Sequence, residues 1–290
     1  MTLIKLTKER WIWCQCAMTL AAAATLMGCV VADEGGTFVA DNNNRRLDAP
    51  VVAPTSLNGD RQARTVPVEL LWFETGDENL DVTLRIESAQ VISTDQGGAV
   101  NLYAEVFNDG ADPVCFVKGT SIQLFDELAV PLATKEHEFI EGSLAYWEAV
   151  DRNLPSCLAA NGGFGYFSSI IPGVDADAVR SMSIIMDGSD AREEHAPREE
   201  LVPVAAQAGL AATGRIDITV ENQGDRPMQI GFFKVSYFDA DGGFLDWAFV
   251  YDGTLDPIAA GERRVVGAPT FGLPRPPAEL MISIDAQPTD

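Results

Sequence analysis

The sequence predicts an all-β protein made of two consecutive antiparallel β-sandwiches, and three observations lead to that prediction. Short runs of alternating apolar and polar residues recur along the chain between polar turns, which is the pattern of half-buried strands. The stretch at 103–126, YAEVFNDGADPVCFVKGTSIQLFD, returns in outline at 217–239 as DITVENQGDRPMQIGFFKVSYFD. No residue pattern in the first of these copies requires a long helix.

The two copies share their spacing as well as their composition. Each has an alternating run, an Asn-x-Gly turn, a proline, a second run and an aromatic-Asp stop. Five positions separate the turn asparagine from the proline in both copies, and the copies also close alike, with AVRSMSIIMD at 178–187 and AELMISID at 278–285. A spacing kept at several points indicates a duplicated fold.

Length and charge limit the classes of function. The chain has 290 residues, enough for two domains of about 100 residues each, and 47% of them are hydrophobic. It has 43 acidic and 20 basic residues, a formal net charge of -23. Such a surface repels phosphate backbones, so we expect no nucleic-acid partner. No motif calls for a cofactor.

The N-terminus has the form of a secretory signal. Lys5, Lys8 and Arg10 precede an apolar run at 11–27, so we assign residues 1–28 to the signal. The run is also near the lower length limit of a membrane span, so an uncleaved anchor stays open.

The end of the signal, LMGC at 26–29, resembles the lipobox of bacterial lipoproteins. The resemblance implies cleavage before a lipidated Cys29, and the Val30 that follows implies an outer-membrane address. The sequence VVA at 30–32 also has the small-residue spacing of an ordinary cleavage site, which would give a periplasmic or secreted protein.

The cysteines fit an oxidising compartment. Cys14 and Cys16 leave with the signal and Cys29 carries the lipid, so Cys115 and Cys157 remain as one pair. We therefore predict a disulfide between them. The second copy has neither cysteine.

Domain boundaries follow from changes in composition. Residues 29–66 are rich in Asp, Asn, Gly, Pro and Ala without sustained periodicity, and we predict a disordered tether there. The first sandwich is expected at 67–190 and the second at 200–290. The polar stretch GSDAREEHAPREELVP at 188–203 marks the junction between them.

The strands are short and regularly spaced in both copies. The first contains VELLWFET (68–75), LDVTLRIESAQVIS (80–93) and VNLYAEVF (100–107), and the second contains RIDITVEN, IGFFKVSYFD and FLDWAFVY. Strands of this length with polar turns at this spacing favour two tandem immunoglobulin-like sandwiches.

Three short motifs give a more specific resemblance. IQLFD at 122–126 and VSYFD at 235–239 resemble the five-residue motif of bacterial FxLYD domains, and the Asn-x-Gly turns and LDPIAAG at 255–261 are similar to that family's turns. The resemblance covers residues 80–187 and 204–285. It implies an extracytoplasmic β-sandwich without catalytic residues.

The first copy is about 13 residues longer than the second, near KEHEFIEGSLAYWEAVD at 135–151. Loops grafted onto a rigid scaffold often carry function, and Tyr146 and Trp147 are typical anchor residues for a partner. Alternatively, these two aromatic side chains cover an open end of the sandwich or the other domain.

The sequence gives little support for a metal site or for catalysis. Asp239, Asp241 and Asp246 resemble the start of a calcium loop, but Val250 occupies the position that needs a glutamate, and a hairpin turn explains the same residues. His137 and His195 each stand among glutamates whose side chains would not converge on one metal ion. The chain has neither a G-x-S-x-G nor an H-E-x-x-H motif. We therefore predict no metal site and no catalytic residues.

The leading hypothesis is a non-enzymatic, lipid-anchored protein of the bacterial cell envelope that binds or scaffolds a protein or glycan. One alternative is a carbohydrate-binding accessory to an envelope hydrolase, with Trp147, Trp247 or Tyr251 stacking on sugar rings. A second alternative is a calcium-dependent adhesin. The sequence does not indicate an oligomeric state.

Overall fold

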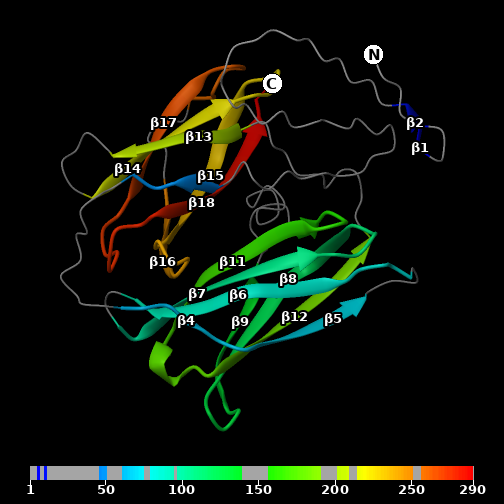
Figure 1. Ribbon diagram of the computed structural model, residues 1–290, viewed down its shortest axis with the longest axis vertical. Coiled ribbons are helices and arrows are strands. Elements are labelled where there is room, and N and C mark those ends of the chain that lie inside the picture. Colours follow the sequence, from blue (N-terminus) through cyan, green and yellow to red (C-terminus); the bar gives the residue numbers. More distant parts are fainter. Residues whose placement is uncertain are drawn as a thin grey trace. The chain divides into compact units, whose positions relative to one another are not determined.

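The computed structural model describes residues 46–50, 61–74, 79–94, 97–138, 156–190, 201–208, 214–250 and 256–289, and two short N-terminal strands (Figure 1). The chain divides into two compact units, Met1–Gly35 and Gly36–Asp290. In the first unit, β1 (Lys5–Leu6) pairs with β2 (Arg10–Trp11), and the rest of the expected signal peptide lies outside the described residues. Both sandwiches belong to the second unit.

The first sandwich, sandwich 1, has two sheets. One has the order β11-β7-β6-β4, formed by β4 (Arg64–Thr65), β6 (Leu84–Ser93), β7 (Ala99–Asn108) and β11 (Gly163–Pro172). The other has the order β10-β8-β12-β5, with β9 also pairing with β8, and contains β5 (Val68–Glu74), β8 (Val114–Phe125), β9 (Pro131–Glu138), β10 (Ser156–Leu158) and β12 (Ser181–Asp190). The 3-10 helix η2 (Ala176–Ala178) links β11 to β12.

One strand pair in sandwich 1 is parallel, which differs from the expected all-antiparallel pattern. β5 pairs parallel to β12, whereas β4, directly before it, pairs antiparallel to β6 of the other sheet. The chain changes sheets at Pro67, which has no N–H to donate, while its carbonyl accepts the amide of Met182. β4 therefore forms one edge of the first sheet, and β5 forms one edge of the second.

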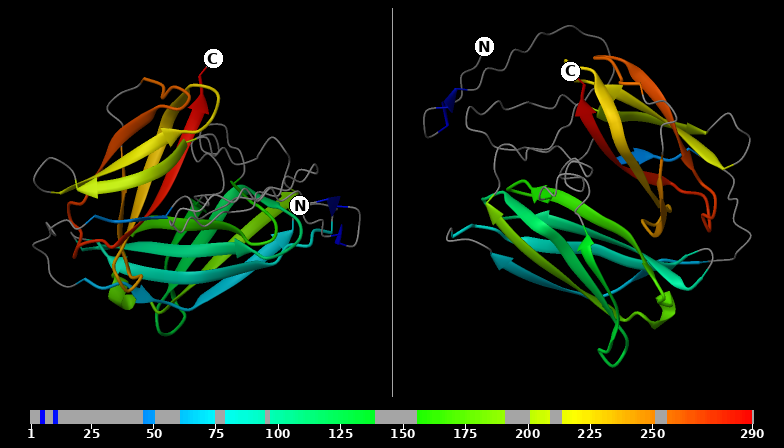
Figure 2. Two further views of the ribbon diagram at one scale, coloured as in Figure 1. Left: turned by 45° about the horizontal axis from the view of Figure 1, so that its top comes forward. Right: turned by 180° about the vertical axis from the view of Figure 1, so that it is seen from behind.

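Sandwich 2 has two sheets in a similar arrangement, but all of its described strand pairs are antiparallel (Figure 2). Its first sheet has the order β13-β14-β17, formed by β13 (Leu201–Ala208), β14 (Arg215–Asn222) and β17 (Arg263–Pro269). Its second sheet has the order β16-β15-β18-β3, formed by β3 (Arg46–Asp48), β15 (Met228–Phe238), β16 (Phe244–Phe249) and β18 (Glu279–Pro288).

Most strands correspond in order between the sandwiches, whereas β4 and β10 occur only in sandwich 1. β6, β7 and β11 match β13, β14 and β17, while β9, β8 and β12 match β16, β15 and β18. In both, a segment that comes earlier in the chain, β5 or β3, occupies the edge beside the last strand. The all-β sandwich fold predicted from the sequence is thus confirmed, and six strands recur in the same order in both sandwiches.

Each sandwich has its own apolar core. Alternate residues of β7, among them Leu102, Ala104 and Val106, face the core of sandwich 1 and are fully buried. Phe233, Val235 and other alternate residues of β15 fill the core of sandwich 2 in the same way. The hydrophobic alternation that predicted the strands therefore also sets which face is inside.

The prediction of a disordered tether at 29–66 is wrong for two segments. β3 at 46–48 pairs with β18, and β4 at 64–65 pairs with β6. Leu47 packs against the core of sandwich 2, so β3 contributes apolar contact as well as hydrogen bonds. Sandwich 2 consequently includes residues that precede sandwich 1, and the expected bounds of 200–290 were too narrow.

Candidate functional site

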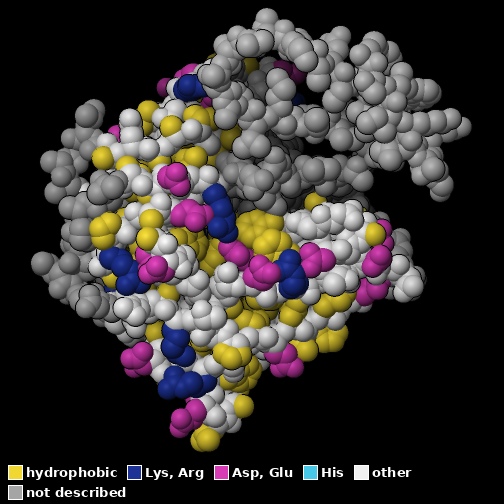
Figure 3. Space-filling view, viewed as in Figure 1, with side chains coloured by type: hydrophobic (Ala, Val, Ile, Leu, Met, Phe, Trp, Pro, Cys, Tyr) yellow, Lys and Arg dark blue, Asp and Glu magenta, His cyan; other side chains and the backbone are white. Residues whose placement is uncertain are grey.

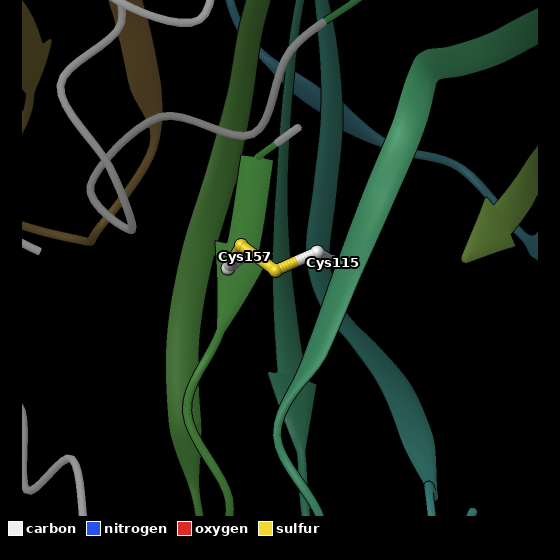
Figure 4. Close-up of a disulfide and its surroundings, with 2 residues drawn as sticks. All are labelled: Cys115 and Cys157. Atoms are coloured by element: carbon white, nitrogen blue, oxygen red, sulfur yellow. A yellow bond between two sulfur atoms is a disulfide. The ribbon is translucent and has the colours of Figure 1, made fainter. Parts of the chain in front are cut away.

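The predicted disulfide is present in sandwich 1 (Figure 4). Cys115 on β8 lies directly opposite Cys157 on β10, and the two sulfur atoms are bonded. Both side chains are buried. Because β10 is only three residues long, the covalent bond supplies much of what holds this strand beside β8. The pair is a structural staple.

Most residues predicted to meet a partner or a lipid lie outside the described residues. Cys29, Tyr146, Trp147 and Tyr251 all fall there. Trp247 is described: it lies on β16, half-buried, with its ring 4.9 Å from that of Phe249. The Nζ of Lys234 lies 4.3 Å from the centre of the Trp247 ring, so a cation already covers part of that aromatic surface.

The acidic turn at 239–243 is a hairpin turn, and both carboxylate oxygens of its first aspartate have partners. Oδ1 of Asp239 accepts the amides of Asp241 and Gly243 at 3.0 and 2.7 Å, and Oδ2 lies 2.6 Å from Arg275. The β8–β9 turn is built alike, since Oδ1 of Asp126 accepts two backbone amides of its own turn. Among the described residues, no group of three or more His, Cys, Asp or Glu side chains could hold a metal ion.

The two sandwiches meet across the faces of their sheets that point away from the cores. Residues of β7 are buried on both sides of the strand, which requires a second layer over the outward face. Gln90, Tyr103 and Ser168 lie side by side on that face, on β6, β7 and β11. The residues of sandwich 2 that contact this face lie on β15, β16 and β18. We call this contact region the junction.

The side chain of Gln90 in sandwich 1 makes two hydrogen bonds to the backbone of the β15–β16 hairpin in sandwich 2. Its Nε2 donates to the carbonyl of Gly242 at 3.1 Å, and its Oε1 accepts the amide of Phe244 at 2.8 Å. An amide side chain thereby satisfies one donor and one acceptor of a neighbouring backbone, which fixes the position of the hairpin.

Polar side chains cross the junction at further points. Asn101 donates to Oδ1 of Asp246 at 2.6 Å, and the hydroxyls of Ser236 and Ser168 are 3.2 Å apart. Lys234, with an exposed fraction of 4%, donates from Nζ to the carbonyl of Ser168. Burying an ammonium group is costly unless it is hydrogen-bonded. The bond from Lys234 to Ser168 therefore favours one fixed arrangement of the two sandwiches.

An aromatic cluster forms the apolar centre of the junction. The ring of Tyr103 lies 4.8 Å from Phe238 and 5.4 Å from Phe244, and Tyr166 and Met281 complete the contact. The hydroxyl of Tyr103 donates to Glu105 at 2.8 Å. Burial, and then the adjacent Glu105 carboxylate, raise the pKa of Tyr103 well above its usual value.

Two arginines before sandwich 1 also tie the sandwiches together. Arg46 pairs with Glu105 of sandwich 1 at 2.6 Å and with Glu279 of sandwich 2 at 2.9 Å. Arg61 donates to the carbonyls of Ser93 and Gly272, again one on each side. Sequence reasoning missed these contacts because they join residues far apart in the chain.

A cavity of about 580 Å³ opens beside the β15–β16 hairpin. Its lining comes from the segment before β4, from the β15–β16 turn and from the loop before β18. The lining includes the ion pair of Asp239 and Arg275, the exposed Asp241, and small or cyclic apolar residues. Sequence analysis singled out Asp239 and Asp241 but missed Arg275.

Comparisons with known proteins identify no family. No protein-family model and no curated protein matches the chain. Red sea bream transglutaminase is a solved structure that matches 72% of this chain and 30% of its own, at 13% identity and a TM-score of 0.22. The chain thus spans less than a third of that protein, and the likeness is too low to support an argument.

Proposed function

We propose that this chain is a non-enzymatic, lipid-anchored protein of the bacterial cell envelope that binds or scaffolds a protein or glycan partner. One observation carries the proposal: two sandwiches are fastened by buried polar and aromatic contacts into a single compact unit. A stiff double sandwich presents its loops at fixed positions, as a display scaffold needs.

The repeated motifs support the immunoglobulin-like and FxLYD-like interpretation. The segments 122–126 and 235–239 end equivalent strands, β8 and β15, and each final aspartate caps the same kind of hairpin. The buried disulfide fits a protein that folds outside the cytoplasm. Both features agree with an extracytoplasmic sandwich.

The anchor rests on LMGC at 26–29, with Cys29 as the lipidated residue. The described residues contain no helix of the length and apolarity that crossing a membrane requires. Val30 supports the outer membrane as the destination, and cleavage at VVA would instead give a periplasmic or secreted protein.

For the partner contact, Tyr146 and Trp147 in the insertion are the leading candidates. Nucleic acid is disfavoured by the net charge of -23, and on the face drawn in Figure 3 the Lys and Arg side chains are interspersed with Asp and Glu. Two contacts weigh against the alternatives: Lys234 covers part of the Trp247 ring that a sugar would need, and both oxygens of Asp239 have donors.

Metabolic labelling with a fatty acid tests the anchor. The native chain should take up label and partition with membranes, and Cys29→Ala should do neither. Cys14→Ala is the matched control and should behave as the native chain does. Label retained in Cys29→Ala would refute lipidation at this residue.

Affinity capture from envelope extract tests the partner contact. Tyr146→Ala and Trp147→Ala should lose a partner that the native chain retains, because truncating an interface anchor commonly costs 2 kcal/mol or more, roughly thirtyfold in affinity. Phe271→Ala removes another aromatic ring, 69% exposed, and should not change capture. Equal capture by all variants would remove the insertion from the proposal.

A further inference from the structure

The cavity beside the β15–β16 hairpin has one carboxylate without a counter-charge. Asp239 is neutralised by Arg275 at 2.6 Å and is further satisfied by two backbone amides. Asp241 is exposed and uses only its backbone N–H in the turn, and no described side chain donates to its carboxylate. The titratable side chains lining the cavity therefore sum to one negative charge.

The rest of the lining is mainly aliphatic. Ala63, Ala240, Pro276, Pro277 and Ala278 contribute methyl and ring methylene groups. A lysine side chain has the matching form, because its methylene stem packs on apolar surface while its ammonium stays at a polar rim. An anionic ligand would be repelled by the carboxylate of Asp241, and a purely apolar ligand would leave that carboxylate unpaired.

The duplicated hairpin shows that this charge is special to sandwich 2. The turns at 126–130 and 239–243 make the same backbone and Asp-side-chain hydrogen bonds, so Leu128 stands where Asp241 stands. Leu128 is 77% exposed. Because the turn is the same with either side chain, the Asp241 carboxylate is not needed to form it.

We propose that this cavity receives a lysine side chain from a protein partner, with the ammonium paired to Asp241 and the stem against the alanines and prolines. The net charge of -23 draws basic segments toward the molecule. The proposal deepens the binding function above by naming the chemistry of the partner, and it rests on that function for the partner being a protein.

The test is a titration of the purified full chain with Nα-acetyl-lysine amide, followed through the amide resonances of Gly242 and Gly243. We expect saturable shifts that disappear with Nα-acetyl-norleucine amide, which has a similar stem but no ammonium. Asp241→Asn and Asp241→Leu should bind about tenfold more weakly, the loss expected of one charge-assisted hydrogen bond. Asp225→Asn, whose side chain is 98% exposed on another turn, should bind as the native chain does.

Shifts of equal size with norleucine amide, or unchanged binding in Asp241→Asn, would overturn the proposal. A second arm uses spermidine, and tighter binding of this free polyamine than of a lysine-containing peptide would exclude a protein lysine as the ligand. The result is independent of the anchor: failed fatty-acid labelling of Cys29 would leave lysine binding intact, and failed titration would leave the anchor intact.

Discussion

Asn108 and Asn222 occupy equivalent positions in the two sandwiches and make equivalent hydrogen bonds. Nδ2 of Asn108 donates to the carbonyls of Asp112 and Ala159 at 2.9 and 3.1 Å, and Nδ2 of Asn222 donates to those of Arg226 and Ile258 at 2.7 and 2.8 Å. Each Oδ1 accepts an amide two residues later. Both asparagines are fully buried, so each fastens its turn to the loop before β11 or β17.

Replacing either asparagine should destabilise its sandwich. Asn222→Ala removes two donated bonds and one accepted bond from a fully buried side chain, so we expect a loss of about 2 to 3 kcal/mol in the free energy of unfolding. Asn222→Asp should be worse at neutral pH, because a carboxylate would face two carbonyl oxygens. Denaturant unfolding measures both, with the exposed Asn79→Ala as control. A loss below about 0.5 kcal/mol for Asn222→Ala, the range of ordinary surface changes, would contradict this account.

The disulfide should stabilise sandwich 1 directly. The cysteines are 42 residues apart, so opening their bond is expected to lower the stability of sandwich 1 by about 4 kcal/mol in the chain-entropy model. Amide hydrogen exchange should quicken most in β8 and β12 of Cys115→Ala/Cys157→Ala, and less in β15, which feels the loss only through the junction. Unchanged exchange in β8 and β12 would contradict a stabilising role of the disulfide.

The junction should make the two sandwiches unfold together. Phe244→Ala empties part of the aromatic cluster and should cost about 3 to 5 kcal/mol, the usual range for a buried phenylalanine. Calorimetry is expected to show one transition for the native chain and two for Phe244→Ala combined with Gln90→Ala. Leu128→Ala, 77% exposed, is the control that should keep one transition. Two transitions in the native chain would mean that the sandwiches are energetically separate.

The parts of the fold that are encoded locally could be predicted from the sequence. The alternation in RIDITVEN gives β14, and the Asn-x-Gly signals give turns whose side chains bond within four residues. The disulfide followed from counting cysteines. These predictions needed no knowledge of which distant strands would meet.

The junction and the cavity could not be predicted, because their partners are distant in the chain. Gln90 and Phe244 are 154 residues apart, and β3 is three residues long and pairs with a strand more than 230 residues later. Asn101 and Glu105 are polar residues on the outward face of β7, a pattern typical of a solvent-facing side. Their burial is visible only once sandwich 2 is in place.

The β8–β9 and β15–β16 hairpins offer a matched pair of variants at the third residue after their aspartates, Asp126 and Asp239. Ala129 and Gly242 are equivalent and have φ of 58° and 77°, a left-handed conformation that only glycine adopts freely. Ala129→Gly should therefore stabilise the chain by up to about 1 kcal/mol, and Gly242→Ala should destabilise it by a similar amount. Thermal melting of both, beside Ala206→Gly on β13, measures the difference. The same sign for Ala129→Gly and Gly242→Ala would refute the equivalence.

Two of the buried tyrosines, Tyr103 and Tyr237, should make stability fall at alkaline pH. Burial raises the pKa of Tyr103, with the Glu105 carboxylate adding to it, and burial followed by Asp246 raises the pKa of Tyr237. An unfolded tyrosine ionises near pH 10, so the unfolded state loses these protons first. The stabilisation is complete below that pH and declines as the pH rises above it.

Tyrosinate absorbance and circular dichroism should therefore change together, with the signal of the buried tyrosines appearing only on unfolding. Tyr237→Phe should shift this alkaline transition upward, although it also loses the bond from the Tyr237 hydroxyl to the carbonyl of Pro269. Stability at neutral pH, measured in parallel, separates the two effects. Ionisation of every tyrosine near pH 10 in the folded chain would show that the junction and the core of sandwich 2 admit water.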